Sequence, residues 1–235
     1  MQVKLIQAYL AHYLRYLRTD HAHEADALAV WETQANWQAN FATASMDLAA
    51  AYATSLTSQT SRRHYSRSGF APREFMLALL AWEPAFVRDA FVDLFDEQRS
   101  LDGRVQRFEL YLDELLARYR EAFPKKDIPS HYHDDDYGMV SLYLALQYPE
   151  TYAPYSTPLL QDTLRKFGAA NPPLTADLPR YVKLLRTADQ FIAREEKIQA
   201  AHRARLREGT DYPGPTKLLA WDFLRFVQRN NQVKP

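Results

Sequence analysis

Apolar side chains recur at steps of three and four residues through most of this 235-residue chain. This spacing places them on one face of an α-helix, which is buried against a neighbouring element. The first 17 residues show the pattern clearly, with apolar residues at Val3, Ile6, Leu10, Tyr13, Leu14 and Leu17. Similar spacing or high alanine content marks the segments 22–57, 70–82, 84–95, 100–123, 137–148, 158–167, 178–207 and 217–229. The sequence therefore predicts a mainly α protein of about nine helices with little or no strand.

Residue types that commonly begin or end helices lie at the ends of these predicted segments. Pro72 suits the first turn of a helix, because its missing N–H would have no partner there. Ser100 is a plausible N-cap and Gly168 lies where a helix is expected to end. The alanine-rich segment 22–57 is compatible with one long helix or two shorter ones.

A polar connector at 125–136 is the one candidate domain boundary. The linkers are short, so the simplest prediction is a single helical module over 1–235. The alternative is two lobes, 1–124 and 137–229, joined by this connector.

Composition excludes several classes of protein. The chain has no cysteine, which excludes disulfides, thiolate metal sites and a cysteine nucleophile. Its six glycines form no phosphate-binding loop, and no Gly-x-Ser-x-Gly motif occurs. The N-terminus has no signal-peptide pattern, and no run of 18 apolar residues is present. We expect a cytoplasmic protein with no membrane partner, no cofactor and no catalysis of its own.

The 29 basic and 29 acidic side chains balance, but they are unevenly distributed. The densest basic segment has Arg62, Arg63 and Arg67, with Tyr65 between them and Arg73 nearby. The planar guanidinium of arginine can bind a phosphate through two N–H groups, and a tyrosine ring can stack on a base. These five residues are therefore the candidate nucleic-acid-binding residues. The alternative is a solvated surface loop.

A second basic stretch covers 180–207 and has eight Lys or Arg residues against three acids. Its end, His202-Arg-Ala-Arg-Leu-Arg, is a candidate contact for nucleic acid or an acidic partner. The alternative is that cations at a helix C-terminus interact with the helix dipole.

Two further clusters have a structural interpretation that we favour. His131, His133 and Asp134–Asp136 contain the usual ligands of Zn or Mn, but three aspartates before a helix are explained by capping and by the helix dipole. We therefore assign no metal site. Tyr143, Tyr148, Tyr152 and Tyr155 suit a pocket for a planar ligand, but core packing is the favoured interpretation.

A series of short motifs, taken in order, resembles the N-terminal region of McrB-like AAA+ proteins, the motor subunits of modification-dependent restriction systems. The series covers roughly residues 31–229 and includes Trp37-Gln-Ala-Asn-Phe, Phe70-Ala-Pro-Arg-Glu-Phe-Met, the run 85–97, Arg104-Val-Gln-Arg-Phe, His131-Tyr-His-Asp, the run 141–152, Asp211-Tyr-Pro-Gly-Pro and Trp221-Asp-Phe.

The resemblance implies a helical DNA-targeting or regulatory module of an anti-phage defence system. Such a module acts with a GTP- or ATP-hydrolysing AAA+ motor, in cis or in trans, and with a nuclease subunit. This chain ends at Pro235 without a Walker A loop, so we expect no nucleotide hydrolysis from it. A protein-interaction module that senses a phage component or docks on the motor or nuclease is the alternative. A metal-dependent hydrolase using His131, His133 and Asp134–Asp136 is a third hypothesis.

Overall fold

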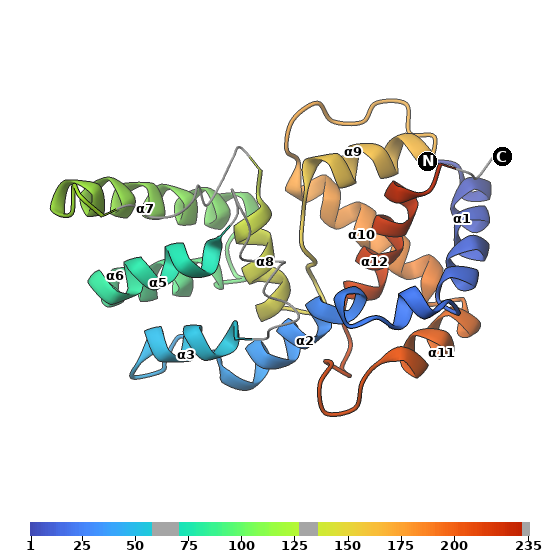
Figure 1. The fold of residues 1–235 in the computed structure, drawn as a ribbon. Helices are drawn as coiled ribbons and strands as arrows, with labels where there is room; N and C mark the ends of the chain where they lie inside the picture. The colour runs from blue at the N-terminus through green and yellow to red at the C-terminus, as the bar shows by residue number, and fades with distance from the viewer. Residues whose placement is uncertain (58–70, 127–135, 232–235) are drawn as a thin grey trace.

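The computed structural model describes residues 1–57, 71–126 and 136–231, and the mainly helical class is confirmed there (Figure 1). These ranges contain eleven α-helices, one short 3-10 helix and no strand. In chain order the elements are α1 (Val3–Tyr16), η1 (Asp20–His23), α2 (Ala25–Asn40), α3 (Leu48–Ser55), α5 (Pro72–Trp82), α6 (Pro84–Leu94), α7 (Leu101–Ala122), α8 (Gly138–Gln147), α9 (Thr157–Lys166), α10 (Leu178–Ile192), α11 (Glu196–Arg205) and α12 (Leu218–Arg229).

The predicted number of helices was too low because two long segments are each divided. The segment 22–57 contains α2 and α3, and the segment 178–207 contains α10 and α11. The prediction of one long helix over 178–207 is wrong. The stripe of Leu185, Ala188 and Ile192 would continue at positions 195, 196 and 199, which are occupied by two glutamates and a glutamine. The next buried apolar residue, Ile198, is out of phase, so the chain turns at 193–195 to bury it.

The helices form two groups with α2 and α8 between them (Figure 1). Helices α3, α5, α6 and α7 make one group, and α1, α9, α10, α11 and α12 make the other. Helix α1 packs against α11 and α12, so the first helix lies among the last ones. Most of the 125–136 connector lies outside the described residues, and the lobes 1–124 and 137–229 stay a prediction.

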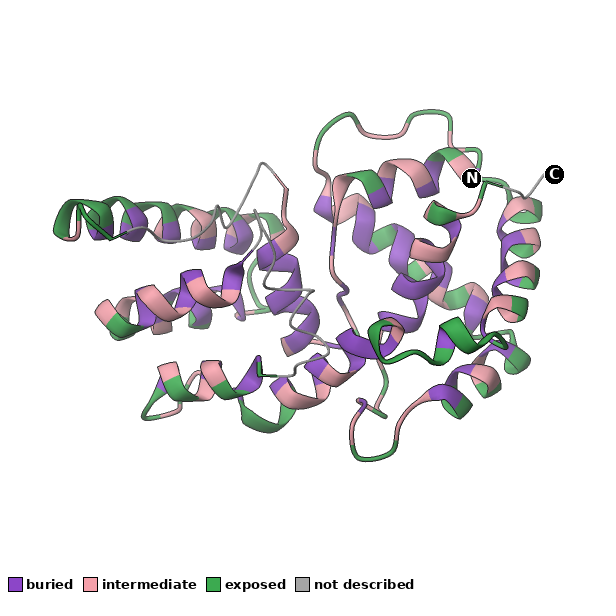
Figure 2. Ribbon diagram, in the orientation of Figure 1, coloured by how far each residue is buried: buried purple, intermediate pink, exposed green. Residues whose placement is uncertain are grey.

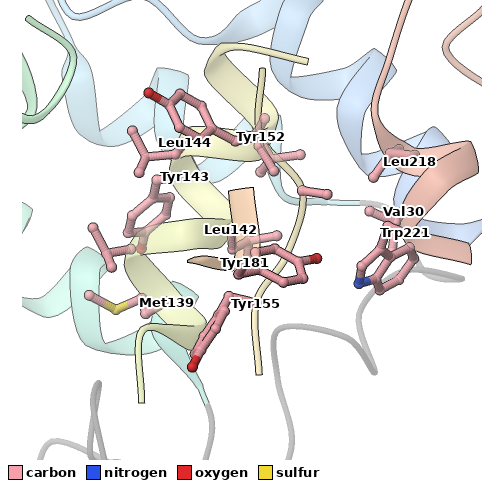
Figure 3. Packing of buried hydrophobic residues seen from close by; sticks show 14 of the residues in the cluster. Val30, Met139, Leu142, Tyr143, Leu144, Tyr152, Tyr155, Tyr181, Leu218 and Trp221 are labelled. Carbon is pink, nitrogen blue, oxygen red and sulfur yellow. The ribbon is translucent and has the colours of Figure 1, made fainter. Parts of the chain in front are cut away.

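One hydrophobic cluster runs through both groups. Helix α8 is at its centre, since every residue from 139 to 146 is buried (Figures 2 and 3). Trp37 of α2 lies beside it, with its ring stacked 5.8 Å from that of Tyr143. The hydroxyls of Tyr143 and Tyr52 are 2.6 Å apart, so the aromatic core also pairs its buried polar atoms.

Helix ends follow the local signals of the sequence. The hydroxyl of Ser100 accepts a hydrogen bond from the N–H of Gly103 and caps α7. Gly168 has a φ of 69°, the left-handed conformation that ends α9. Across the described ranges, no helix combines the length and apolar character needed to cross a membrane.

Candidate nucleic-acid interface

Of the five candidate residues of the predicted basic loop, the structure describes only Arg73. Arg62, Arg63, Tyr65 and Arg67 lie outside the described residues, so their role stays a prediction. Arg73 lies in the first turn of α5 and is half-buried. Its Nε is buried and has no hydrogen-bond partner among the described residues.

The guanidinium of Arg73 is close enough to Tyr52 to affect its hydroxyl. Burial raises the pKa of Tyr52 well above its ordinary value, and the charge of Arg73 opposes that shift. Because Arg73 is half-buried, it presents only part of its side chain to a ligand.

The second basic stretch lies on α10, α11 and the residues just after α11. Two of its eight cations, Arg205 and Arg207, are bonded to carboxylates within the protein. The side chain of Arg205 is 0% exposed, and its Nη2 donates to Oδ2 of Asp222 at 2.7 Å. Its Nε donates to Nδ1 of His202 at 3.1 Å, and its guanidinium lies 5.1 Å from the ring centre of Trp31. The prediction that this end of the stretch offers a contact for nucleic acid is wrong for Arg205, because a buried charge needs its carboxylate partner inside the protein.

Tyr13 and His202 complete this buried network. Tyr13 of α1 donates its hydroxyl to the same carboxylate oxygen of Asp222 at 2.6 Å. Burial, and then the neighbouring charge of Arg205, lower the pKa of His202 to about 3. His202 is therefore neutral at pH 7, and its Nδ1 accepts the hydrogen bond from Arg205. The network holds α1, α11 and α12 together.

Arg207 is also committed to partners within the chain. Its Nε and Nη2 donate to the two carboxylate oxygens of Asp211 at 3.0 and 2.7 Å, and Nη2 also reaches Glu32 at 3.0 Å. The hydrogen bond to Asp211 is the main reason that the pKa of Arg207 is raised. This bidentate contact leaves the guanidinium little capacity for a phosphate.

A surface hollow of about 490 Å³ lies beside Arg207. Its walls come from α2, α11 and the segment that follows α11, with Ala35, Arg203, Leu206, Arg207, Glu208, Gly209, Thr210, Asp211 and Pro213 as lining residues. Charges of both signs line it, so the hollow has no clear preference for an anion.

Five of the other six cations of the basic stretch face solvent, whereas Arg180 is half-buried and donates to the carbonyl of Asn171 at 2.6 Å. Lys183, Arg186, Arg194, Lys197 and Arg203 are exposed, and none of them belongs to an ion pair between described residues. The acid of α10, Asp189, is paired with Lys217. Two exposed glutamates lie where α11 begins: Glu195 just before the helix and Glu196 as its first residue. The exposed side chains of this stretch therefore carry more positive than negative charge, and they are spread over α10, α11 and the turn between them.

The candidate metal-binding run has one described member. Asp136 accepts hydrogen bonds from the N–H and the hydroxyl of Thr157, both at 3.2 Å. These bonds stabilise the first turn of α9, whereas the capping interpretation had assigned the aspartates to the start of the helix that follows them, α8. His131, His133, Asp134 and Asp135 lie outside the described residues. Elsewhere in the described ranges no group of three or more potential ligands occurs.

The four clustered tyrosines are part of the hydrophobic core, as predicted. Tyr143, Tyr152 and Tyr155 are buried (Figure 3). Tyr148 is half-buried and packs against the same cluster. Tyr155 packs edge-on against Tyr181 of α10, with the ring centres 5.2 Å apart.

A buried arginine in α7 was missed by the sequence analysis. Arg104 is 2% exposed, and its Nη1 donates to the carbonyl of Leu94 at 3.0 Å. Its Nη2 donates to the hydroxyl of Tyr152, and Glu97 lies 3.5 Å away. The sequence does contain a signal for this burial: Arg104 lies in the apolar stripe of α7, one turn before Phe108.

The chain matches no protein-family model, no curated protein and no solved structure. The resemblance to McrB-like proteins therefore rests on the order of short motifs in the sequence.

Proposed function

We propose that this chain is a DNA-targeting or regulatory module of a McrB-like anti-phage restriction system. It carries out no catalysis of its own and works in the cytoplasm with an AAA+ motor and a nuclease subunit. The motor is supplied in cis or in trans, and modified or foreign DNA is the ligand.

The observation that supports DNA binding is the exposed positive charge of α10 and α11. Five cations are held at the surface there, whereas the buried arginines Arg104 and Arg205 have partners inside the protein. Phosphate contacts by Lys and Arg supply most of the affinity of a protein for DNA that is independent of base sequence. The basic residues Arg62, Arg63, Arg67 and Arg73, with Tyr65 as a stacking ring, remain the second proposed contact.

A gel-shift titration with plain, 5-methylcytosine and 5-hydroxymethylcytosine duplexes tests the proposal. We expect binding at about 50 mM salt that weakens steeply towards about 200 mM. Changing Arg62, Arg63 and Arg67 together to Ala should weaken binding to all three duplexes and flatten its salt dependence.

The matched control removes charge from a different surface. Arg120→Ala with Lys125→Ala removes two exposed cations at the end of α7, and it should leave binding unchanged. Absence of binding to every duplex at low salt would rule out a DNA-binding role.

The second candidate function is a protein-interaction module that docks on the motor or nuclease subunit or senses a phage component. Its supporting observation is exposed apolar surface on α6 and α7, where Val92 is 53% and Leu110 is 62% exposed. We expect Val92→Asp with Leu110→Asp to abolish a complex with the purified AAA+ portion while leaving DNA binding intact. A complex that survives both changes would remove this surface from consideration.

A further inference from the structure

We infer that α10 lies along the phosphate backbone of duplex DNA, with Lys183 and Arg186 as its main contacts, and does not enter a groove. This inference rests on the proposed DNA-binding function and specifies how one surface carries it out.

The outer face of α10 is a defined stripe. Lys183, Arg186 and Gln190 follow one another at steps of three and four, so they point to the same side of the helix. All three are exposed. The opposite side is apolar and buried, with Leu178, Tyr181, Val182, Leu184, Leu185, Ala188 and Ile192.

The packing of α10 prevents it from acting as a recognition helix. A helix with its side chains is about 10–12 Å across, close to the roughly 12 Å width of the major groove. A helix must therefore project from its domain to reach base edges. Helix α10 contacts α7, α11 and α12, and its buried side is packed within this group of helices, so that α10 does not project from it (Figures 1 and 2). A duplex that approaches its outer face meets phosphates first.

The charges along α10 suit such a contact. From Lys183 to Arg194, in the turn after the helix, the chain advances about 16 Å. Asp189 is the acid within this length, and its charge is compensated by Lys217. Glu195 and Glu196 lie beside Arg194 and reduce the positive field there, so Lys183 and Arg186 should contribute most.

The resulting contact should be independent of base sequence, because phosphates carry no base identity. It should hold the module on DNA while another part of the chain or of the assembled system reads the modification. A negatively charged face of a partner protein is the competing occupant, and in that case the two cations would make no contribution to DNA binding.

The test measures the salt dependence of DNA binding by fluorescence anisotropy. The probes are two labelled duplexes of unrelated sequence, each about 20 base pairs long, with salt varied from about 50 to about 200 mM. The variants are the full chain with Lys183→Ala and Arg186→Ala, and the control with Arg120→Ala and Lys125→Ala. Far-UV circular dichroism and thermal unfolding confirm that each variant is folded.

We expect the slope of log K against log salt to become shallower by about 1.8 in the α10 variant, because two phosphate contacts are lost. The slope should change equally for both duplexes and stay the same in the control. If the wild type binds both duplexes but the α10 variant keeps its slope, the inference is wrong and the DNA-binding function stands. That result would remove Lys183 and Arg186 from the DNA contact. If the wild type binds neither duplex, the proposed function fails and the inference fails with it.

Discussion

The positive charge of Arg205 is compensated inside the protein by one carboxylate, that of Asp222. The change Asp222→Ala removes this partner and also the acceptor for the hydroxyl of Tyr13. We expect the free energy of unfolding to fall by about 3–5 kcal/mol, because the guanidinium stays buried without compensation. Urea unfolding followed by circular dichroism measures the loss.

Two further variants test this explanation. Asp162→Ala removes a half-buried carboxylate that is paired with Arg165 and accepts a hydrogen bond from Gln228, and it should cost about 1 kcal/mol or less. The double change Arg205→Met with Asp222→Leu removes both charges and should cost less than Asp222→Ala. A loss of under about 1 kcal/mol for Asp222→Ala would show that the pair is not needed for stability.

His202 should make the protein sensitive to acid. Its pKa is about 3 in the folded protein, mainly because it is buried, against about 6.5 when unfolded. The unfolded state therefore binds more protons between these values, and the free energy of unfolding decreases as the pH falls from about 6.5 towards 3. Its contribution is fully present above pH 6.5, and about 2 kcal/mol should be lost by pH 5.

The matched variant is His202→Asn, whose side-chain oxygen can accept the hydrogen bond from Arg205 without titrating. Urea unfolding at pH 7 and pH 5 should show a smaller decrease for this variant than for the wild type. Equal decreases in both proteins would assign the acid sensitivity to other groups.

Helix α10 is fixed at its start by a side-chain cap. The carboxylate of Asp177 accepts a hydrogen bond from the N–H of Arg180 at 2.9 Å. We expect Asp177→Ala to lower the free energy of unfolding by about 1 kcal/mol, because one N–H of the first turn loses its partner. Thr175→Ala, at a nearby exposed position, should have almost no effect in the same denaturant titration. Equal effects of the two changes would argue against a capping role.

At the scale of elements, the sequence predicted helix positions well because their signals are local. Pro72, Ser100 and Gly168 act on the few residues beside them, and each lies where the structure begins or ends a helix. The error at 178–207 arose because helix-forming residues continue through 193–195 while the apolar stripe does not. Ile198 is out of phase with the apolar stripe of α10, and this mismatch is the signal in the sequence that indicates the turn.

The two groups of helices share one core, and Trp37 is at the connection between them. Trp37 is 0% exposed and packs against Phe41, Tyr52 and Tyr143. We expect Trp37→Ala to lower the free energy of unfolding by about 3–5 kcal/mol. If both groups unfold together, hydrogen exchange should speed up in α7 and in α12 alike.

Trp82→Ala is the matched control for this change. Trp82 is half-buried at the end of α5, where it contacts Tyr119 and Phe123. Its loss should affect exchange mainly in α5 and α7. Unchanged exchange of α12 in Trp37→Ala would show that the two groups are independently stable.

The sequence by itself determined the helical class and most helix ends, because apolar spacing and capping depend on neighbours within one or two turns. The tertiary structure decided which cations of the basic stretch are free to bind a ligand. Lys183 and Arg205 belong to the same stretch, yet one is exposed and the other is buried. The difference comes from Asp222 of α12, which pairs with Arg205 and also accepts a hydrogen bond from Tyr13 of α1. Tyr13 and Asp222 are separated by 209 positions, and no local pattern predicts that they meet.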